Sequence, residues 1–169
     1  MKKILLILIF MMVVHPLRAA SDENANDGDK GTSGLAVPRF ASLRSGEVNM
    51  RTGPGTRYPI EWVFTRPGLP VEIIAEYEIW RRIRDTDGTE GWVHKISLTG
   101  KRSAIVTGTV RELRDDHDDH AAIVAHLDPG AIGQLVSCSK DWCKLKFEGI
   151  KGYMRKDQFW GAYPNEIFG

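Results

Sequence analysis

The chain has 169 residues, with 23 basic and 22 acidic side chains and a formal net charge of +1. Loss of the N-terminal basic residues Lys2, Lys3 and Arg18 would change that charge to −2. Nucleic acid is therefore not an expected partner, because its binding needs a concentrated basic face.

The N-terminus has the pattern of a secretory signal peptide. Lys2 and Lys3 precede Ile4–Val14, an unbroken apolar run of 11 residues, which is typical of such signals. A membrane-spanning helix needs about 20 apolar residues. Residues 1–20 are therefore predicted to be a cleaved signal peptide, which implies a periplasmic or secreted protein with no stable membrane span after cleavage.

Residues 21–36 are predicted to be a disordered leader. Ser21–Gly34 has almost no apolar side chains, and such a segment buries too little surface to offset the entropy lost on ordering.

An internal repeat organises the rest of the chain. Proline and tryptophan are 13 residues apart in both copies, and a glycine followed by an aromatic residue comes 10 or 11 residues later. Repeats at a fixed period indicate repeated structural units. Two domains are predicted, at residues 37–100 and 103–165. The matching positions are Pro67-Gly68, Trp80 and Gly91-Trp92-Val93 in the first copy and Pro129-Gly130, Trp142 and Gly152-Tyr153-Met154 in the second.

Each copy has the signals of short strands. Val71–Ala75 and Trp80–Arg84 are rich in branched and aromatic residues, and Asp85–Thr89 carries the Asp-Gly pair of a tight hairpin. The second copy repeats the plan, and neither copy keeps a helical period over three turns. The fold class is therefore predicted to be all-β, with two small barrels in tandem.

The stretch Val48–Pro59, VNMRTGPGTRYP, resembles the opening signature of bacterial SH3 (SH3b) domains, and the Trp80 and Gly91-Trp92-Val93 positions fit that family too. The chain as a whole looks like a tandem exported SH3-like protein of Gram-negative bacteria. The resemblance implies SH3-like barrels that bind cell-wall peptide or glycan, and no cofactor.

The candidate ligand-binding residues belong to the first copy. Glycines in the loop from Thr52 to Pro59 let a ligand approach the backbone, and functional groups are common on loops held by a rigid scaffold. In the alternative interpretation these glycines only form the turn. The candidates are Arg51, Arg57 and Tyr58, together with Trp62 and Tyr77, which are expected to be exposed near strand ends.

Two further expectations concern the strands. Large aromatic residues of the strands are expected to fill the barrel cores, because one aromatic ring buries a large area. They are Trp80 and Trp92 in the first copy and Trp142 and Tyr153 in the second. Arg81, Arg82 and Arg84 give the first copy a basic strand. This strand favours a carboxylate-bearing ligand on the first copy, with a solvated charged face as the alternative.

The second copy lacks the Gly-Pro-Gly loop and has Asp115–His120, DDHDDH, in its place. Histidine with carboxylate offers metal ligands, so metal binding by this loop, with His126 nearby, is an alternative to a solvated acidic loop. Cys138 and Cys143 are predicted to form a disulfide, because an even cysteine count in an exported chain favours one. A structural zinc site would need a second pair of ligands.

No nucleophile, base and oxyanion-stabilising group can be placed together. The predicted function is a non-catalytic cell-envelope binding or scaffold protein, which recognises peptide, peptidoglycan or a protein partner. The alternatives are an assembly protein with no small ligand and a metal-binding protein.

Overall fold

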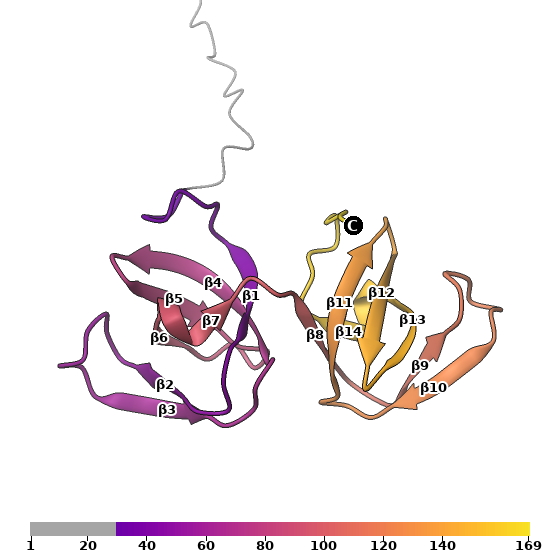
Figure 1. Cartoon of the computed structure of the whole chain (residues 1–169), viewed down its shortest axis with the longest axis horizontal. Helices are drawn as coiled ribbons and strands as arrows, with labels where there is room; N and C mark the ends of the chain where they lie inside the picture. The colour runs from indigo at the N-terminus through magenta and orange to yellow at the C-terminus, as the bar shows by residue number, and fades with distance from the viewer. Residues whose placement is uncertain (1–29) are drawn as a thin grey trace, which may run out of the picture.

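The computed structural model describes residues 30–169, which form two β-barrels side by side (Figure 1). The predicted signal peptide, residues 1–20, and residues 21–29 of the predicted leader lie outside the described residues. In the described part of the chain, no helix is long and apolar enough to cross a membrane.

The first barrel is one seven-stranded antiparallel sheet in the order β3-β2-β6-β5-β4-β1-β7. A single 3-10 turn, η1 (Lys95–Ser97), precedes the last strand. The strands are β1 (Arg39–Leu43), β2 (Val48–Arg51), β3 (Ile60–Phe64), β4 (Pro70–Tyr77), β5 (Trp80–Arg84), β6 (Glu90–His94) and β7 (Leu98–Thr99).

The second barrel repeats this order as β10-β9-β13-β12-β11-β8-β14. The predicted repeat and the all-β fold of two tandem barrels are thereby confirmed. The strands are β8 (Ser103–Val106), β9 (Arg111–Arg114), β10 (Ile123–Leu127), β11 (Ile132–Cys138), β12 (Trp142–Phe147), β13 (Ile150–Arg155) and β14 (Phe159–Trp160), with the 3-10 turn η2 (Lys156–Gln158) before β14.

The glycine of each glycine–aromatic pair lies where two strands meet over the core. A Cβ on Gly91 would lie 2.5 Å from Cγ of Met50, and one on Gly152 would lie 2.5 Å from Cγ of Leu113. Met50 and Leu113 are both fully buried. Glycine at these positions therefore lets β2 and β9 close their barrels.

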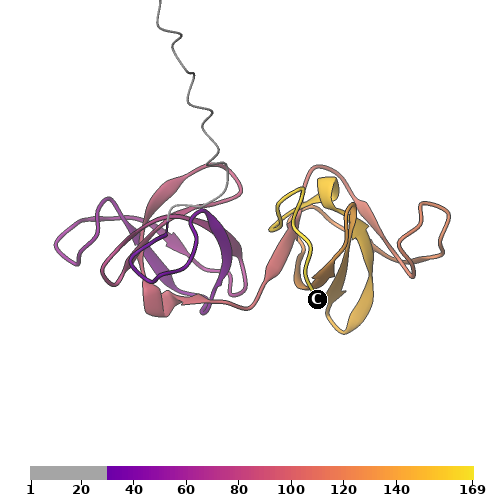
Figure 2. The same ribbon diagram turned by 90° about the horizontal axis from the view of Figure 1, so that it is seen from above.

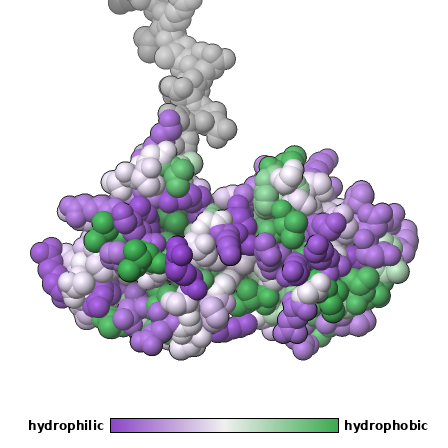
Figure 3. Space-filling view, in the orientation of Figure 1, coloured by the Kyte–Doolittle hydropathy of each residue, from purple (hydrophilic) through white to green (hydrophobic). Residues whose placement is uncertain are grey.

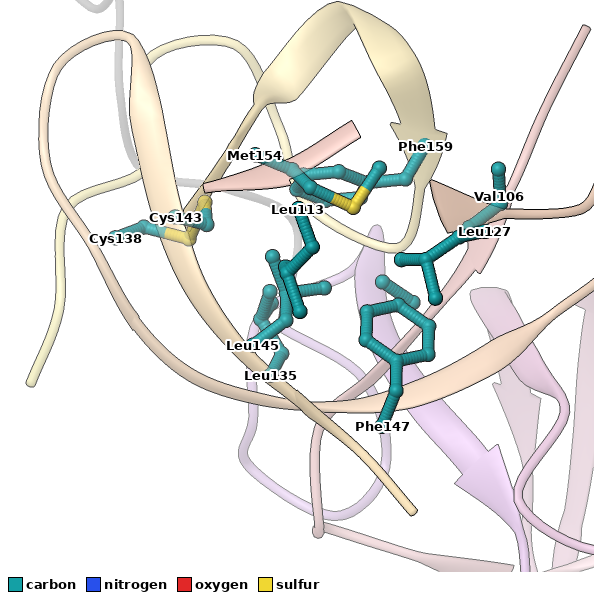
Figure 4. Packing of buried hydrophobic residues seen from close by; sticks show 11 residues of the cluster. Val106, Leu113, Leu127, Leu135, Cys138, Cys143, Leu145, Phe147, Met154 and Phe159 are labelled. Atoms are coloured by element: carbon teal, nitrogen blue, oxygen red, sulfur yellow. A yellow bond between two sulfur atoms is a disulfide. The ribbon is translucent and has the colours of Figure 1, made fainter. Parts of the chain in front are cut away.

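Alternation along the strands places one set of side chains inside each barrel, because successive residues of a strand point to opposite faces. The first core is Ala41, Leu43, Val48, Met50, Phe64, Val71, Ile73, Ile83, Val93 and Leu98. The second core, shown in part in Figure 4, is Ala104, Val106, Leu113, Leu127, Leu135, Cys138, Cys143, Leu145, Phe147, Met154 and Phe159.

The aromatic residues differ from the expectation that they fill the cores. Only Trp80 is buried, at 8% exposure, and it lies outside the core cluster of its barrel. Trp92, Trp142 and Tyr153 are partly exposed. The physical reason is the strand period: Gly91 and Val93 turn inward in β6, so the residue between them faces outward.

Residues 30–36, the last part of the predicted disordered leader, are folded. Lys30 and Ala36 form a β-bridge, and the backbone N–H of Ser33 donates to Glu76 Oε2 at 2.6 Å. The segment is ordered because it bonds to Glu76, 43 residues from Ser33 in the sequence. The composition of the segment alone does not reveal this partner.

The disulfide between Cys138 and Cys143 is confirmed. The two residues are direct partners in the β11–β12 hairpin, and both lie in the second core (Figure 4). Cys138 also forms two backbone hydrogen bonds with Phe168, which ties down the C-terminal segment.

Reduction of this disulfide is expected to lower the free energy of unfolding of the second barrel by about 2 kcal/mol, the amount that chain entropy gives for so short a loop. Urea unfolding with and without dithiothreitol measures the difference. A Cys138→Ala/Cys143→Ala variant serves as control, since dithiothreitol should leave its midpoint unchanged. Equal midpoints for the oxidised and reduced wild-type chain would contradict this account.

The two barrels contact each other through aromatic side chains. Phe40, on the outer face of β1, lies edge-on to Trp160 at 4.9 Å between ring centroids and 4.8 Å from the ring of Tyr163. The Tyr163 hydroxyl donates to Glu72 Oε1 at 2.9 Å. Burial, followed by this hydrogen bond, raises the pKa of Tyr163 above its ordinary value. The contacts join β1 and β4 to the end of the second barrel.

Polar groups complete the junction. The Ser103 hydroxyl donates to the carbonyl oxygen of Gly68 at 2.6 Å and lies 2.5 Å from the Ser42 hydroxyl. Arg66 Nη2 donates to the carbonyl oxygen of Gly130 at 2.6 Å. Both Pro-Gly turns of the repeat therefore lie at the interface between the barrels.

Candidate functional site

The loop between β2 and β3 is held in shape by its own backbone and by Arg51. The Thr52 N–H donates to the carbonyl oxygen of Pro59 at 3.2 Å, and Arg51 Nη1 donates to the carbonyl oxygens of Tyr58 at 2.7 Å and Thr56 at 3.3 Å. Arg51, which was predicted to contact ligand, therefore uses its guanidinium to support the loop.

Arg57 and Tyr58 contact each other in this loop, and Tyr77, at the end of β4, lies near enough to Arg57 to affect its pKa; we call these three residues the Arg57 cluster. The guanidinium of Arg57 lies 5.0 Å from the Tyr58 ring centroid, and its Nη2 donates to the Tyr58 hydroxyl at 3.2 Å. This hydrogen bond raises the pKa of Arg57, with a smaller electrostatic contribution from Tyr77. Tyr77 is 52% exposed. The cluster offers a fixed positive charge beside accessible aromatic surface.

Gly53 is required by the position of Tyr58. A Cβ at residue 53 would lie 2.5 Å from Cδ1 of the Tyr58 ring, closer than real Cβ contacts come. The glycine therefore lets the ring lie against the loop backbone, and the family-like Gly-Pro-Gly run positions an aromatic side chain as well as forming a turn.

Trp62 is exposed as predicted, at 56%, but its register places it on the side of the sheet opposite to Arg51. Trp62 on β3 is the cross-strand partner of Met50, whose side chain points into the core. Arg51, the next residue of β2, pairs with Ile60 after a register shift. Adjacent residues of a strand point to opposite sides. Of the five predicted ligand-binding residues, the structure joins Arg57 and Tyr58 directly, with Tyr77 near enough to affect the pKa of Arg57. Arg51 takes a supporting position, and Trp62 pairs with Met50.

A row of basic and aromatic residues crosses the outer face of each sheet at the same place, and we call it the outer row. The strand registers align Arg82, Trp92 and Arg51 in the first barrel and Lys144, Tyr153 and Arg114 in the second. The prediction missed Trp92 and Tyr153 as surface residues. The available sequence signal was strand alternation, because a strand that turns Val93 inward turns Trp92 outward.

The loop between β9 and β10 is built like its counterpart between β2 and β3. Arg114 Nη1 donates to the carbonyl oxygen of Ala121 at 2.6 Å, as Arg51 does in the first barrel. Asp119 pairs with Arg155 at 3.0 Å, and the ring of His117 lies 5.7 Å from that of Tyr153. The two loops lie at opposite ends of the molecule (Figure 2).

The histidines of the second barrel do not converge. His126, on β10, lines a cleft of about 570 Å³ between the barrels, whereas His117 and His120 belong to the β9–β10 loop. Among residues 30–169, no group of three or more histidine, cysteine or acidic side chains is arranged to hold a metal ion.

The basic strand of the first barrel is charge-paired, in contrast to the expectation that it attracts a carboxylate. Arg81 is buried and its Nε lies 3.0 Å from Glu76 Oε1. Arg82 and Arg84 both pair with Glu90, at 2.9 and 2.7 Å. The arginines are paired because β4 and β6, on either side of β5, place Glu76 and Glu90 beside them. Counting charges along β5 alone does not show this alignment.

Two tandem seven-stranded antiparallel sheets define a pair of small β-barrel domains. The family model described as "Bacterial SH3 domain" matches residues 44–100 and 110–161. The chain belongs to the bacterial SH3 domain family, with one copy in each barrel, which confirms the resemblance drawn from the sequence.

The chain is 26% identical over 151 residues to the putative N-acetylmuramoyl-L-alanine amidase YrvJ of Bacillus subtilis (strain 168). The match covers 79% of this chain but only 28% of that protein.

Two solved structures are also similar, NlpC2 and NlpC1 from Trichomonas vaginalis, at 14% and 15% identity with TM-scores of 0.35 and 0.34. They are matched over 75% and 79% of this chain and 49% of each of theirs.

Proposed function

We propose that the protein is a non-catalytic binding protein of the bacterial cell envelope, acting outside the cytoplasm, with peptidoglycan or its peptide as ligand. The observation that carries the proposal is the cluster of Arg57, Tyr58 and Tyr77 on a loop fixed by Arg51. A rigid loop with a cation and exposed rings loses little entropy on binding, which favours recognition.

The family and the relative support the choice of ligand. The curated relative is a putative N-acetylmuramoyl-L-alanine amidase, whose name refers to a bond of peptidoglycan, and the match is confined to 28% of its length. We infer that the shared part binds the wall and that catalysis belongs to the rest of the relative.

The described residues support a binding protein over an enzyme. Both cysteines are joined in a disulfide, so neither is a nucleophile. Three carboxylates of the β9–β10 loop bond to its backbone or to Arg155. Asp116 Oδ1 accepts the backbone N–H of His117, Asp118 Oδ1 accepts that of His120, and Asp119 pairs with Arg155. These groups are accounted for by local structure, without a catalytic assignment.

Arg57→Ala is expected to lower the affinity for purified peptidoglycan about tenfold, the effect of losing one central contact. The measurement is co-sedimentation of the full chain with insoluble peptidoglycan. Arg57 is exposed, so its removal leaves the loop backbone in place. Lys95→Ala, which removes another exposed positive charge at the start of η1, is the control. A wild-type chain that stays in the supernatant, or equal binding by Arg57→Ala, would count against the proposal.

An assembly role is the second candidate function. One edge strand of each sheet, β3 in the first and β10 in the second, carries exposed apolar residues, and such edges favour pairing with another chain. Apolar patches also interrupt the hydrophilic surface of both barrels (Figure 3). The exposed apolar residues are Ile60, Trp62 and Val63 on β3 and Ile123 and Val124 on β10. Self-association in analytical ultracentrifugation without peptidoglycan binding would favour this role.

A further inference from the structure

The outer faces of the two barrels differ in charge, although their strands are in the same register. Beside the outer row, a second row crosses β4, β5 and β6 as Glu72, Arg84 and Glu90. Its counterpart crosses β11, β12 and β13 as Gln134, Lys146 and Lys151. We call these the charge rows. The position of Glu72 is occupied by Gln134 in the second barrel, and the position of Glu90 is occupied by Lys151.

The acids of the first barrel neutralise its cations. Arg84 pairs with Glu90 at 2.7 Å and with Glu72 at 3.2 Å, and Arg82 pairs with Glu90 at 2.9 Å. Glu72 is also used by Tyr163 at the junction of the barrels. The one cation of the first charge row, Arg84, is therefore already paired with carboxylates of the same barrel.

The lysines of the second barrel have no such partners. Among the described residues, no carboxylate forms an ion pair with Lys144, Lys146 or Lys151, although eight arginine–carboxylate pairs are present elsewhere in residues 30–169. Lys146 and Lys151 are exposed. Glu148 occupies the adjoining hairpin turn and is not paired with either of them.

Lys146 and Lys151 lie directly opposite each other across β12 and β13. Cβ atoms of such partners are about 5 Å apart, and like charges in this position destabilise a sheet. An anion between the two ammonium groups would remove the repulsion. The arrangement therefore costs stability in the free protein and favours a bound anion.

Tyr153 adds a flat surface beside these charges. Lys144 Nζ lies 5.3 Å from the centroid of the Tyr153 ring, and the ring is partly exposed. The Lys144–Tyr153 pair lies two residues along β12 and β13 from the Lys146–Lys151 pair, so both pairs face the same side of the sheet. The face combines three cations with an accessible ring.

We propose that the outer face of β12 and β13, with Lys144, Lys146, Lys151 and Tyr153, is a second binding site, which takes carboxylate groups of an anionic wall polymer. The choice of a wall polymer rests on the proposed function. The site is on the barrel that lacks the Gly-Pro-Gly loop, and it is separate from the Arg57 cluster, so the chain can hold one polymer at two points. Two linked contacts bind more tightly than either alone.

The test uses the full chain and two probes, poly-L-glutamate and insoluble peptidoglycan. Lys146→Gln/Lys151→Gln is expected to weaken binding to poly-L-glutamate about tenfold at low salt, as judged by isothermal titration calorimetry. The residual binding should also depend less on salt. Lys95→Gln/Lys101→Gln removes the same charge from exposed positions outside this face and should bind like the wild type.

Several results would overturn the inference. These are equal affinity of the lysine variant and the wild type, an equal loss in the control, and equal lysine-dependent binding of polyphosphate or anionic phospholipid vesicles. In the experiment with insoluble peptidoglycan, loss of binding after amidation of the wall carboxylates would support the inference. Wild-type binding to poly-L-glutamate but not to peptidoglycan would refute the proposed function and leave the anionic site in place.

Discussion

Replacement of Glu76 with alanine is expected to lower the free energy of unfolding of the first barrel by about 3 kcal/mol, the lower end of the range for breaking a buried ion pair. The Glu76 side chain has no exposed surface, and its Oε1 accepts from Arg39 and pairs with Arg81 at 3.0 Å. Its other oxygen accepts the Ser33 N–H. Removal would leave Arg81 buried without its partner and release residues 30–36.

The same carboxylate makes stability depend on pH. Burial opposes its ionisation, but the hydrogen bonds from Arg39 and from the Ser33 backbone and hydroxyl outweigh burial and lower the pKa of Glu76 from 4.5 to about 2. The unfolded chain therefore takes up this proton first as the pH falls. The stabilisation is fully present above about pH 5 and decreases toward pH 2.

Urea unfolding of the wild type and of Glu76→Gln at pH 7, 4 and 3 tests both expectations. The difference in the free energy of unfolding between the two chains should be largest at pH 7 and shrink at pH 3. Glutamine keeps the shape of the side chain, so the difference reports charge. A difference that is constant with pH, or a Glu76→Ala chain as stable as the wild type, would contradict the assignment.

Phe40→Ala is expected to separate the unfolding of the two barrels and to remove about 3 kcal/mol of stability, the usual cost of deleting a buried phenylalanine ring. Phe40 is 8% exposed, yet it belongs to neither core cluster. It is buried by Trp160, Tyr163 and the guanidinium of Arg102, which lies 5.5 Å from the ring centroid. Both rings that contact it come from the second barrel, so its removal weakens the contact between the barrels.

Differential scanning calorimetry measures this coupling. The wild type should unfold in one transition and Phe40→Ala in two. Tyr163→Phe, which loses the hydrogen bond to Glu72 but keeps the ring, should shift the transition by less, since a neutral partner bonded to a carboxylate contributes about 1.5–3 kcal/mol at most. A single transition at an unchanged temperature in Phe40→Ala would show that the barrels are not coupled through this ring.

The fold could be predicted because its signals are local or repeated. The glycine–aromatic pairs and Pro-Gly turns recur at nearly fixed spacing, and each has a local structural reason, such as the contact of Gly91 with Met50. The disulfide was predictable for the same reason, since Cys138 and Cys143 are separated by one short turn.

The charge distribution was not predictable, because it depends on register across three strands. The basic sequence of β5 suggested a free cationic surface, but Arg84 meets Glu72 on one side and Glu90 on the other. The cation-rich row of the second barrel becomes visible only when Lys146 and Lys151 are placed opposite each other. Single-strand composition contains no such pairing.

The cluster proposed to bind ligand was partly predictable. Arg57 and Tyr58 are neighbours in a recognisable loop, whereas Tyr77 joins them from the end of β4. Arg51 was assigned to the ligand because of its charge, but its hydrogen bonds go to the loop carbonyl oxygens.

The most direct test of the account is the mapping of backbone amide shifts by NMR on the full chain, titrated with soluble peptidoglycan fragments that carry free carboxylates. We predict saturable shifts at Arg57, Tyr58 and Tyr77 and at Lys144, Lys146 and Lys151, with the interface around Phe40 unchanged. An absence of shifts at saturating fragment concentrations, or shifts confined to the edge strands β3 and β10, would contradict it.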